Sequence, residues 1–220
     1  MTAKLAVFDC DGTLVDGQAD VLWAMARAFD QADQPQPDPA RVRRMVGLSL
    51  PVAIRALAPE AADNIQRDLI EFYKAAFRGR REQGLLEEPL YEGIHDLLHS
   101  LHREGWLLAV ATGKSDRGLQ ACLASHGLSE LFISLQTADR HPSKPHPAML
   151  EAALFEAGVD ASDAVMIGDT SYDILMGQSA HVRTIGVAWG YHSPAELSSN
   201  GANVIVDDVD ALRTELERWG

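Results

Sequence analysis

Four aspartates follow two short apolar runs of the sequence. Asp9 and Asp11 come after the first run, one residue apart, and Gly12 allows the chain to turn directly behind them. Asp169 and Asp173 come after a later run. Carboxylates brought to one point repel each other unless a cation lies among them. The four residues therefore predict a site for a hard divalent cation. Mg²⁺ is the expected cofactor because it binds a few carboxylates together with water and substrate phosphate.

A carboxylate that is screened by a metal ion can act as a nucleophile. Its attack on phosphorus forms an acyl-phosphate and divides a hydrolysis into two easier displacements. A second carboxyl group nearby can protonate the leaving oxygen and later activate water. The closely spaced pair Asp9 and Asp11 offers both groups, so the pattern predicts phosphoryl transfer.

Three further residues could bind the phosphoryl group. Thr112 offers a hydroxyl group, and Gly113 offers a backbone amide at the start of a predicted helix. Lys144 can supply positive charge to the transition state. Because Pro142 and Pro145 constrain the loop around Lys144, we expect this side chain to point inward rather than into solvent.

The elements that position these residues are predicted from continuous apolar runs. Such runs are typical of strands buried on both faces of a parallel sheet. They occupy residues 4–8, 106–111, 164–167, 182–188 and 203–206, with 131–135 as a further candidate. Helical patterns lie between them, at 94–105, 115–126 and 147–157. This alternation predicts an α/β fold with a doubly wound, Rossmann-like parallel sheet, whose carboxyl edge gathers the residues named above.

The stretch 17–83 contains no comparable strand, and its apolar residues recur at helical spacing. We therefore expect an all-α insert that forms a cap over the site. The predicted division is an α/β catalytic core of residues 1–16 and 84–220, with a helical cap insert of residues 17–83.

Composition and sequence pattern limit the expected binding partners and the expected cellular location of the protein. The 220-residue chain carries a formal net charge of −13, which disfavours nucleic acid and anionic membrane as partners. No signal peptide is recognised, and no run approaches the roughly 18 apolar residues of a transmembrane helix. Cys10 and Cys122 show no metal-binding spacing and are expected to be reduced thiols, with Cys10 buried and neutral. The expected protein is a cytoplasmic monomer or homodimer that acts on a small phosphorylated metabolite.

Four segments, in order along the chain, resemble the four motifs of the haloacid dehalogenase superfamily. They are Asp-Cys-Asp-Gly-Thr-Leu-Val-Asp at 9–16, Val-Ala-Thr-Gly-Lys at 110–114, Ser-Lys-Pro-His-Pro at 143–147 and Ile-Gly-Asp-Thr-Ser-Tyr-Asp at 167–173. The resemblance covers the whole chain and is strongest to the phosphoglycolate phosphatases. It also implies that the helical insert is the cap that closes over small substrates.

The resemblance implies a role for each matched residue. Asp9 would be the nucleophile, and Asp11 the general acid and base. Thr112, Gly113 and Lys144 would bind phosphate. The metal ligands would be the carboxylate of Asp9, the backbone carbonyl of Asp11, and Asp169, with Asp173 supporting the metal and orienting Lys144.

Other readings of the same residues are weaker. Dehalogenases and phosphonatases of this superfamily lack an acidic residue at the position of Asp11, which favours phosphoryl transfer. A mutase similar to β-phosphoglucomutase stays an alternative, although Thr13-Leu14 differs from the pair typical of mutases. A non-enzymatic phospho-aspartate acceptor is a second alternative, which Asp11 and the helical insert disfavour.

Substrate specificity is expected to lie in the insert. Gly47, Ser49 and Arg55 are the candidate specificity residues. Phosphoglycolate, other small sugar or organic-acid phosphates and pyrophosphate are the candidate substrates. Two histidines stand near the motifs. His146 is expected to cap the following helix, with a contact to substrate as the alternative. His181 stands where the family usually has glycine, so it is expected to need a positive φ.

Overall fold

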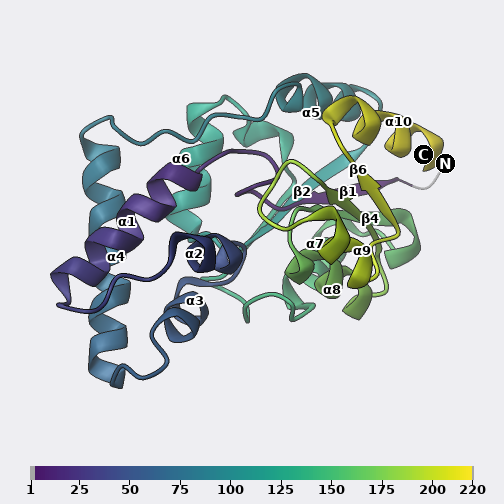
Figure 1. The fold of residues 1–220 in the computed structure, drawn as a ribbon. Helices are drawn as coiled ribbons and strands as arrows, with labels where there is room; N and C mark the ends of the chain where they lie inside the picture. Colours follow the sequence, from purple (N-terminus) through teal and green to yellow (C-terminus); the bar gives the residue numbers. More distant parts are fainter. Residues whose placement is uncertain (1–2, 220) are drawn as a thin grey trace.

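A six-stranded parallel sheet forms the centre of the molecule. The computed structural model describes residues 3–219, and its strands lie in the order β3-β2-β1-β4-β5-β6 (Figure 1). All neighbouring strands pair in parallel. The strands are β1 (Leu5–Phe8), β2 (Leu107–Thr112), β3 (Ser134–Thr137), β4 (Ala164–Gly168), β5 (Arg183–Val187) and β6 (Val204–Val206). The predicted fold class is therefore confirmed.

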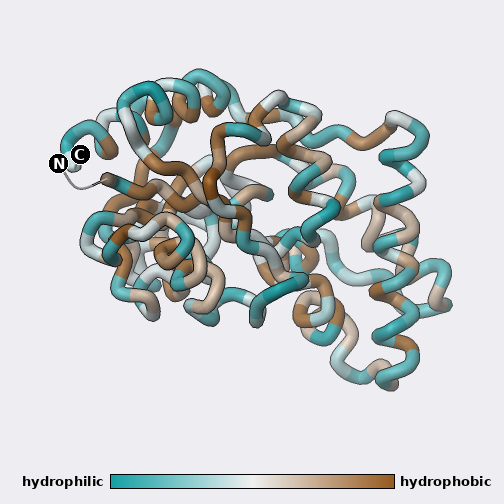
Figure 2. The backbone as a smooth tube through the Cα atoms, turned by 180° about the vertical axis from the view of Figure 1, so that it is seen from behind, coloured by the Kyte–Doolittle hydropathy of each residue, from teal (hydrophilic) through white to brown (hydrophobic). Residues whose placement is uncertain are grey.

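Helices cover both faces of this sheet. They are α5 (Ile94–Arg103), α6 (Asp116–Ser125), α7 (Ala148–Ala157), α8 (Ser171–Ser179), α9 (Pro194–Ser199) and α10 (Val209–Trp219). Side chains alternate between the two faces of a strand, so Ala6 and Phe8 of β1 pack with α5, α6 and α10. Leu5 and Val7 pack on the opposite face with α7 and α8. This double burial explains the continuous apolar runs, and brown, hydrophobic stretches run through the interior of the tube in Figure 2.

One predicted strand lies elsewhere. The candidate run 131–135 is wrong in position, because Leu131 belongs to a short 3-10 helix, Ser129–Leu131, and β3 begins at Ser134. The edge strand β3 buries polar residues instead of an apolar run: Gln136 Nε2 donates a hydrogen bond to Ser134 Oγ at 2.7 Å. Paired in this way, polar side chains occupy the interior, and the hydropathy pattern does not reveal the strand.

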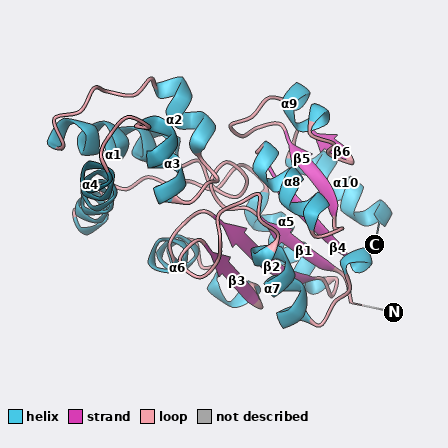
Figure 3. Ribbon diagram, turned by 90° about the horizontal axis from the view of Figure 1, so that it is seen from below, coloured by secondary structure: helices cyan, strands magenta, loops and turns pink. Residues whose placement is uncertain are grey.

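Four helices follow β1 before the chain returns to the sheet. They are α1 (Gln18–Gln31), α2 (Pro39–Met45), α3 (Leu50–Leu57) and α4 (Asp63–Glu82), and Figures 1 and 3 place them on the opposite side of the sheet from α10. They share a hydrophobic cluster that includes Phe29, Ile54 and Leu69. The segment is helical as expected, while the domain boundaries at 16/17 and 83/84 stay a prediction. Within residues 3–219, no helix has the length and apolar character needed to cross a membrane.

His181 ends helix α8 in a left-handed conformation, with φ of +58°. Its amide donates a hydrogen bond to Gln178 O at 3.0 Å, and the Val182 amide donates to Gly177 O at 2.9 Å. This pair of bonds is the Schellman motif, whose left-handed position favours glycine. The expectation of a positive φ at His181 is confirmed. The side chain of His181 is exposed, so packing of the imidazole does not offset the steric cost of this conformation.

Replacing His181 with glycine should therefore stabilise the protein. A side chain in the left-handed region costs about 1–2 kcal/mol, part of which is offset by the greater flexibility of glycine in the unfolded chain. We expect His181→Gly to raise the free energy of unfolding by about 1 kcal/mol in urea titrations. His181→Ala keeps the Cβ atom and should give no gain. Equal stabilisation by both variants would contradict the backbone explanation.

Candidate active site

Three carboxyl groups meet at the carboxyl edge of the sheet. Asp9 follows β1, Asp169 follows β4, and Asp173 lies in the first turn of α8. Their side-chain oxygens can be chosen so that all lie within 4.8 Å of one another, and all three residues are fully buried. The pairing of β1 with β4 creates this contact, since the Asp9 amide donates to Ile167 O at 2.9 Å.

Lys144 is buried among these carboxyl groups. Its Nζ atom lies 2.9 Å from Asp9 Oδ1 and 2.6 Å from Asp173 Oδ1. Burial disfavours the charged ammonium group, but Asp173 and Asp9 outweigh it and hold the pKa of Lys144 above its ordinary value. Lys144 therefore points inward, as its proline-rich loop predicted.

One ammonium group does not balance three buried carboxyl groups. Burial is the main reason that the pKa of Asp9 rises to about 7, and the neighbouring Asp173 contributes to the rise. Burial, Asp173 and Asp9 likewise raise the pKa of Asp169 well above its ordinary value. Asp9 Oδ2 is buried and has no hydrogen-bond partner among the described residues. An unpaired carboxylate oxygen inside an acidic cluster suits a hard divalent cation.

The other oxygens of the cluster are held by neighbouring groups. Asp169 accepts hydrogen bonds from Thr13 Oγ1 at 2.9 Å and from the Tyr191 amide at 2.8 Å. A Cβ atom on Gly190 would lie 2.2 Å from Asp169 Cβ, so this close approach requires glycine. No role in the site was predicted for Thr13 or for the loop around Gly190. Their function depends on the tertiary contact with Asp169, which no local pattern encodes.

Asp173 orients Lys144 from a helix terminus. Its Oδ2 atom accepts hydrogen bonds from the Thr170 amide at 3.0 Å and from Thr170 Oγ1 at 2.7 Å, which leaves Oδ1 for Lys144. The Thr170 hydroxyl in turn caps the first turn of α8, so the two residues form a capping box. The same interaction that begins the helix thus fixes the direction of the Asp173 carboxyl group.

The residues after β2 lie under a loop of the helical segment. Thr112 is buried at the end of β2. A Cβ atom on Gly113 would lie 2.5 Å from Leu48 O and 2.7 Å from Gly47 O, so the backbones of these two segments are in contact. The Ser49 amide donates a hydrogen bond to Ser143 Oγ at 2.8 Å. The loop between α2 and α3 is therefore in direct contact with the candidate phosphate-binding residues.

A cavity of about 440 Å³ lies between the helical segment and the core. Asp11 and Gly113 line it from the core, and Gly47 and Ser49 line it from the helical segment. Arg55 does not belong to the lining. It is exposed on α3, because that helix turns Ala53, Ile54 and Leu57 inward instead. Five cationic residues also line the cavity: Lys74, Arg78, Arg81, Lys114 and Arg117.

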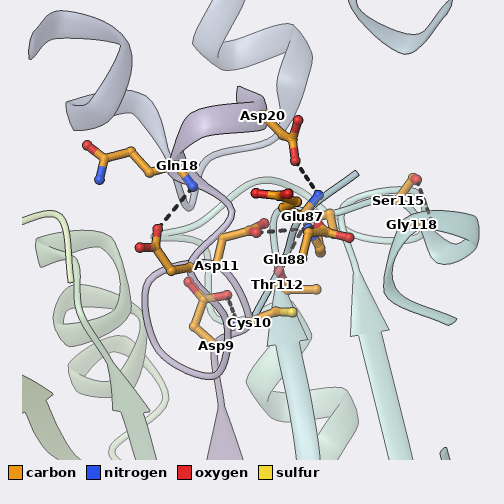
Figure 4. A network of polar contacts seen from close by, with 12 residues as sticks. Asp9, Cys10, Asp11, Gln18, Asp20, Glu87, Glu88, Thr112, Ser115 and Gly118 are labelled. Atoms are coloured by element: carbon orange, nitrogen blue, oxygen red, sulfur yellow. Dashed lines mark hydrogen bonds and ion pairs between the residues drawn. The ribbon is translucent and has the colours of Figure 1, made fainter. Parts of the chain in front are cut away.

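Asp11 lies beside the acidic cluster and has a different partner. Lys114 Nζ lies 2.8 Å from Asp11 Oδ1 and 2.6 Å from Glu88 Oε1. Figure 4 shows Asp11 directed toward Glu88, with Asp9 farther down in the same loop. The sequence predicted Asp11, but Glu88 was missed because it lies outside the four motifs and nothing distinguishes it from its neighbour Glu87.

Two remaining residues of the motifs have structural roles. His146 Nδ1 accepts a hydrogen bond from the amide of Ala148, the first residue of α7, which confirms the expected cap. Cys10 and Cys122 are buried free thiols. Contact with Cys122 and burial raise the pKa of Cys10 well above its ordinary value, so Cys10 is a neutral packing residue as predicted.

Comparison with known proteins agrees with this geometry. Residues 6–187 match the family model described as haloacid dehalogenase-like hydrolase. The chain belongs to this family. A protein of Dickeya dadantii (strain 3937) named "Probable phosphatase IndB" is 36% identical, with 92% of this chain and 89% of that protein covered. A phosphoglycolate phosphatase of Vibrio parahaemolyticus serotype O3:K6 is 30% identical, with 95% of this chain and 94% of that protein covered.

The fold of a solved relative is also close. The crystal structure of a "predicted phosphatase" from Clostridium acetobutylicum has a TM-score of 0.89 and 27% identity, and covers 99% of this chain and 100% of that one. Family membership and these relatives confirm the prediction of an enzyme, a phosphatase of the haloacid dehalogenase superfamily.

The contact at Gly113 can be tested by substitution. Gly113→Ala should push the loop 47–49 away, because the atoms in its path are backbone carbonyl oxygens that cannot rotate aside. We expect faster hydrogen exchange at the Ser49 amide and a loss of about tenfold in kcat/KM, which corresponds to about 1.4 kcal/mol. Gly79→Ala is the matched control, since no atom lies within 4 Å of a Cβ there. Unchanged exchange at Ser49 in Gly113→Ala would contradict the contact.

Proposed function

We propose that the protein is a Mg²⁺-dependent phosphomonoester hydrolase that acts on a small phosphorylated metabolite through an aspartyl-phosphate on Asp9. The observation that carries this proposal is the environment of the Asp9 carboxyl group. Its carboxyl group is fully buried, is paired through Oδ1 with Lys144, and keeps Oδ2 free of partners among the described residues. Asp11 stands two residues further along, beside a cavity that can take the rest of the substrate.

In the first step, an oxygen of Asp9 attacks phosphorus and the ester bond breaks. Asp11 gives a proton to the departing oxygen, and an alcohol is formed. Lys144, the Thr112 hydroxyl and the Gly113 amide hold the phosphoryl oxygens, where their charges and dipoles stabilise the transition state. The products of this step are the alcohol and the phosphorylated Asp9.

In the second step, water attacks the same phosphorus. Asp11, now ionised, takes a proton from that water, and the bond from phosphorus to Asp9 breaks. Inorganic phosphate is released, while Asp9 regains its carboxylate and Asp11 its proton. The net reaction consumes one ester and one water molecule and yields one alcohol and one phosphate.

Mg²⁺ would be held by the carboxylates of Asp9 and Asp169 and by the backbone carbonyl of Asp11, with Asp173 supporting it. When bound, it would neutralise charge so that an anionic nucleophile can meet an anionic phosphate. The buried Oδ2 of Asp9, which has no hydrogen-bond partner among the described residues, supports this assignment. Burial and the neighbouring carboxylates raise the pKa of both Asp9 and Asp169, and a bound cation would offset both effects.

The cavity supports a small organic phosphate as substrate. Five cationic residues line the cavity, although the whole chain has a net charge of −13. Lys74 and Arg81 have carboxylate partners within 4 Å, whereas Arg78 and Arg117 make no ion pair among the described residues. These two residues could bind a second anionic group of the substrate, such as the carboxylate of phosphoglycolate. Gly47 and Ser49, which also line the cavity, would limit the size of the substrate.

Asp9→Asn tests the nucleophile. A neutral amide cannot form the acyl-phosphate, so we expect kcat to fall at least about 1,000-fold, equivalent to about 4 kcal/mol. Phosphate release should be measured on a panel of small phosphate esters that includes phosphoglycolate and pyrophosphate. Asp68→Asn, on the exposed side of α4, is the control and should retain full activity. Substantial turnover by Asp9→Asn would place the nucleophile elsewhere. If the wild-type protein isomerised a sugar phosphate of the panel without releasing phosphate, it would be a mutase.

Metal removal tests the cofactor independently of the substrate. A ligand that binds only the folded state raises the melting temperature, so Mg²⁺ should stabilise the chelator-treated protein and restore its turnover. In Asp169→Asn, the same addition should leave the melting temperature unchanged because one carboxylate ligand is missing. Equal turnover with and without chelator would refute the metal requirement.

A further inference from the structure

Asp11, Lys114 and Glu88 form a partly buried chain of charges beside the acidic cluster. They come from the loop after β1, the turn after β2, and the segment that returns from α4 to the core. The exposed fractions of the side chains are 13% for Asp11, 10% for Lys114 and 7% for Glu88. The ammonium group of Lys114 thus bridges two carboxylates that are far apart in the sequence, with contacts of 2.8 and 2.6 Å.

The bridge keeps Lys114 charged. Burial alone disfavours the ammonium form, but Asp11 and Glu88 outweigh it and raise the pKa of Lys114 well above its ordinary value. A buried ammonium group donates stronger hydrogen bonds than an exposed one and is screened less by solvent. The position of the Lys114 side chain is therefore set by both carboxylates together.

Glu88 is the anchored end of this chain. Its Oε2 atom lies 3.7 Å from Arg81 Nη2 of α4, and its backbone carbonyl accepts a hydrogen bond from His126 Nε2 at 2.8 Å. Gly17 leaves the space in which the carboxylates approach, since a Cβ there would lie 3.1 Å from Asp11 Oδ1 and 3.8 Å from Glu88 Cγ. Both the side chain and the backbone of Glu88 are thus fixed.

Asp11 depends on this arrangement for its orientation. Among the described residues, Lys114 is the group that donates a hydrogen bond to the Asp11 carboxylate, and it contacts only Oδ1. Oδ2 is left for proton exchange with a reacting oxygen. If Lys114 lost its second anchor, its flexible side chain could turn into the cavity that it already lines, and Asp11 would lose its restraint.

We propose that Glu88 is a positioning residue that acts through Lys114 to hold the Asp11 carboxyl group in the orientation needed for proton transfer to the leaving oxygen. The proposal rests on the proposed function, since it requires Asp11 to be the general acid. It assigns to Glu88 no contact with substrate or metal.

The test compares two substrates that need the general acid to different degrees. An alkyl phosphate, taken from the esters that the wild type hydrolyses, has a leaving oxygen that must be protonated. The p-nitrophenolate ion leaves p-nitrophenyl phosphate without a proton. Because kcat/KM reports the reaction only up to the first irreversible step, it isolates the departure of this group from the later attack by water.

We expect Glu88→Ala to lower kcat/KM for the alkyl phosphate by about 10- to 100-fold, since a positioned general acid typically contributes 10²–10⁴-fold. For p-nitrophenyl phosphate, kcat/KM should change by less than about threefold. Glu88→Gln keeps the size and one acceptor oxygen, so it should show a smaller selective loss. Glu87→Ala, at the exposed neighbouring position, should leave both values unchanged.

Equal losses for both substrates, or no loss for either, would overturn the positioning role. Glu88→Gln supplies the same comparison if Glu88→Ala does not fold, and melting temperatures of both variants identify that case. Failure of the proposed function gives a different result, because Asp9→Asn would then keep the activity of the wild type whatever Glu88 does.

Discussion

Burial of Lys144 against Asp9 and Asp173 is the interaction around which the site is built. Charges removed from water are costly unless each is paired and its remaining hydrogen-bonding positions are satisfied. Lys144 pairs with two of the three carboxyl groups, and neutral donors satisfy most of the other oxygens: Thr170 donates to Asp173, and Thr13 and the Tyr191 amide donate to Asp169. Among the described carboxyl oxygens of this cluster, Asp9 Oδ2 is left without a hydrogen-bond partner, and it belongs to the proposed nucleophile. The carboxyl oxygen that lacks a hydrogen-bond partner is thus an oxygen of the residue proposed to react.

The strand order explains how these groups reach each other. Strand β1 lies between β2 and β4, so the residues after β1 are flanked by Thr112 on one side and Asp169 on the other. Because all the strands are parallel, their carboxyl ends share one edge of the sheet. The four helices inserted after β1 return to the core at the same edge, where Glu88 meets the turn that carries Lys114.

The sequence predicted most of what local patterns can encode. Strands buried on both faces gave continuous apolar runs, and the motif residues of the core follow those strands. The edge strand β3 was misplaced because Ser134 and Gln136 satisfy each other in the interior. Glu88 could not be found, since its importance comes from a partner far away in sequence. Arg55 was predicted as a specificity residue because of its charge. Its position on α3, however, lies on the face of the helix that is exposed to solvent.

Full burial of Asp9 also bears on the order of events in turnover. Under the proposed mechanism, the attacking water needs room beside the phosphorylated aspartate, which the alcohol vacates when it departs. The alcohol is then the first product to leave and inorganic phosphate the last. Under this mechanism, free phosphate would rebind to the same form of the enzyme that accepts substrate. It would then act as a competitive inhibitor, and the accumulating product would slow the enzyme.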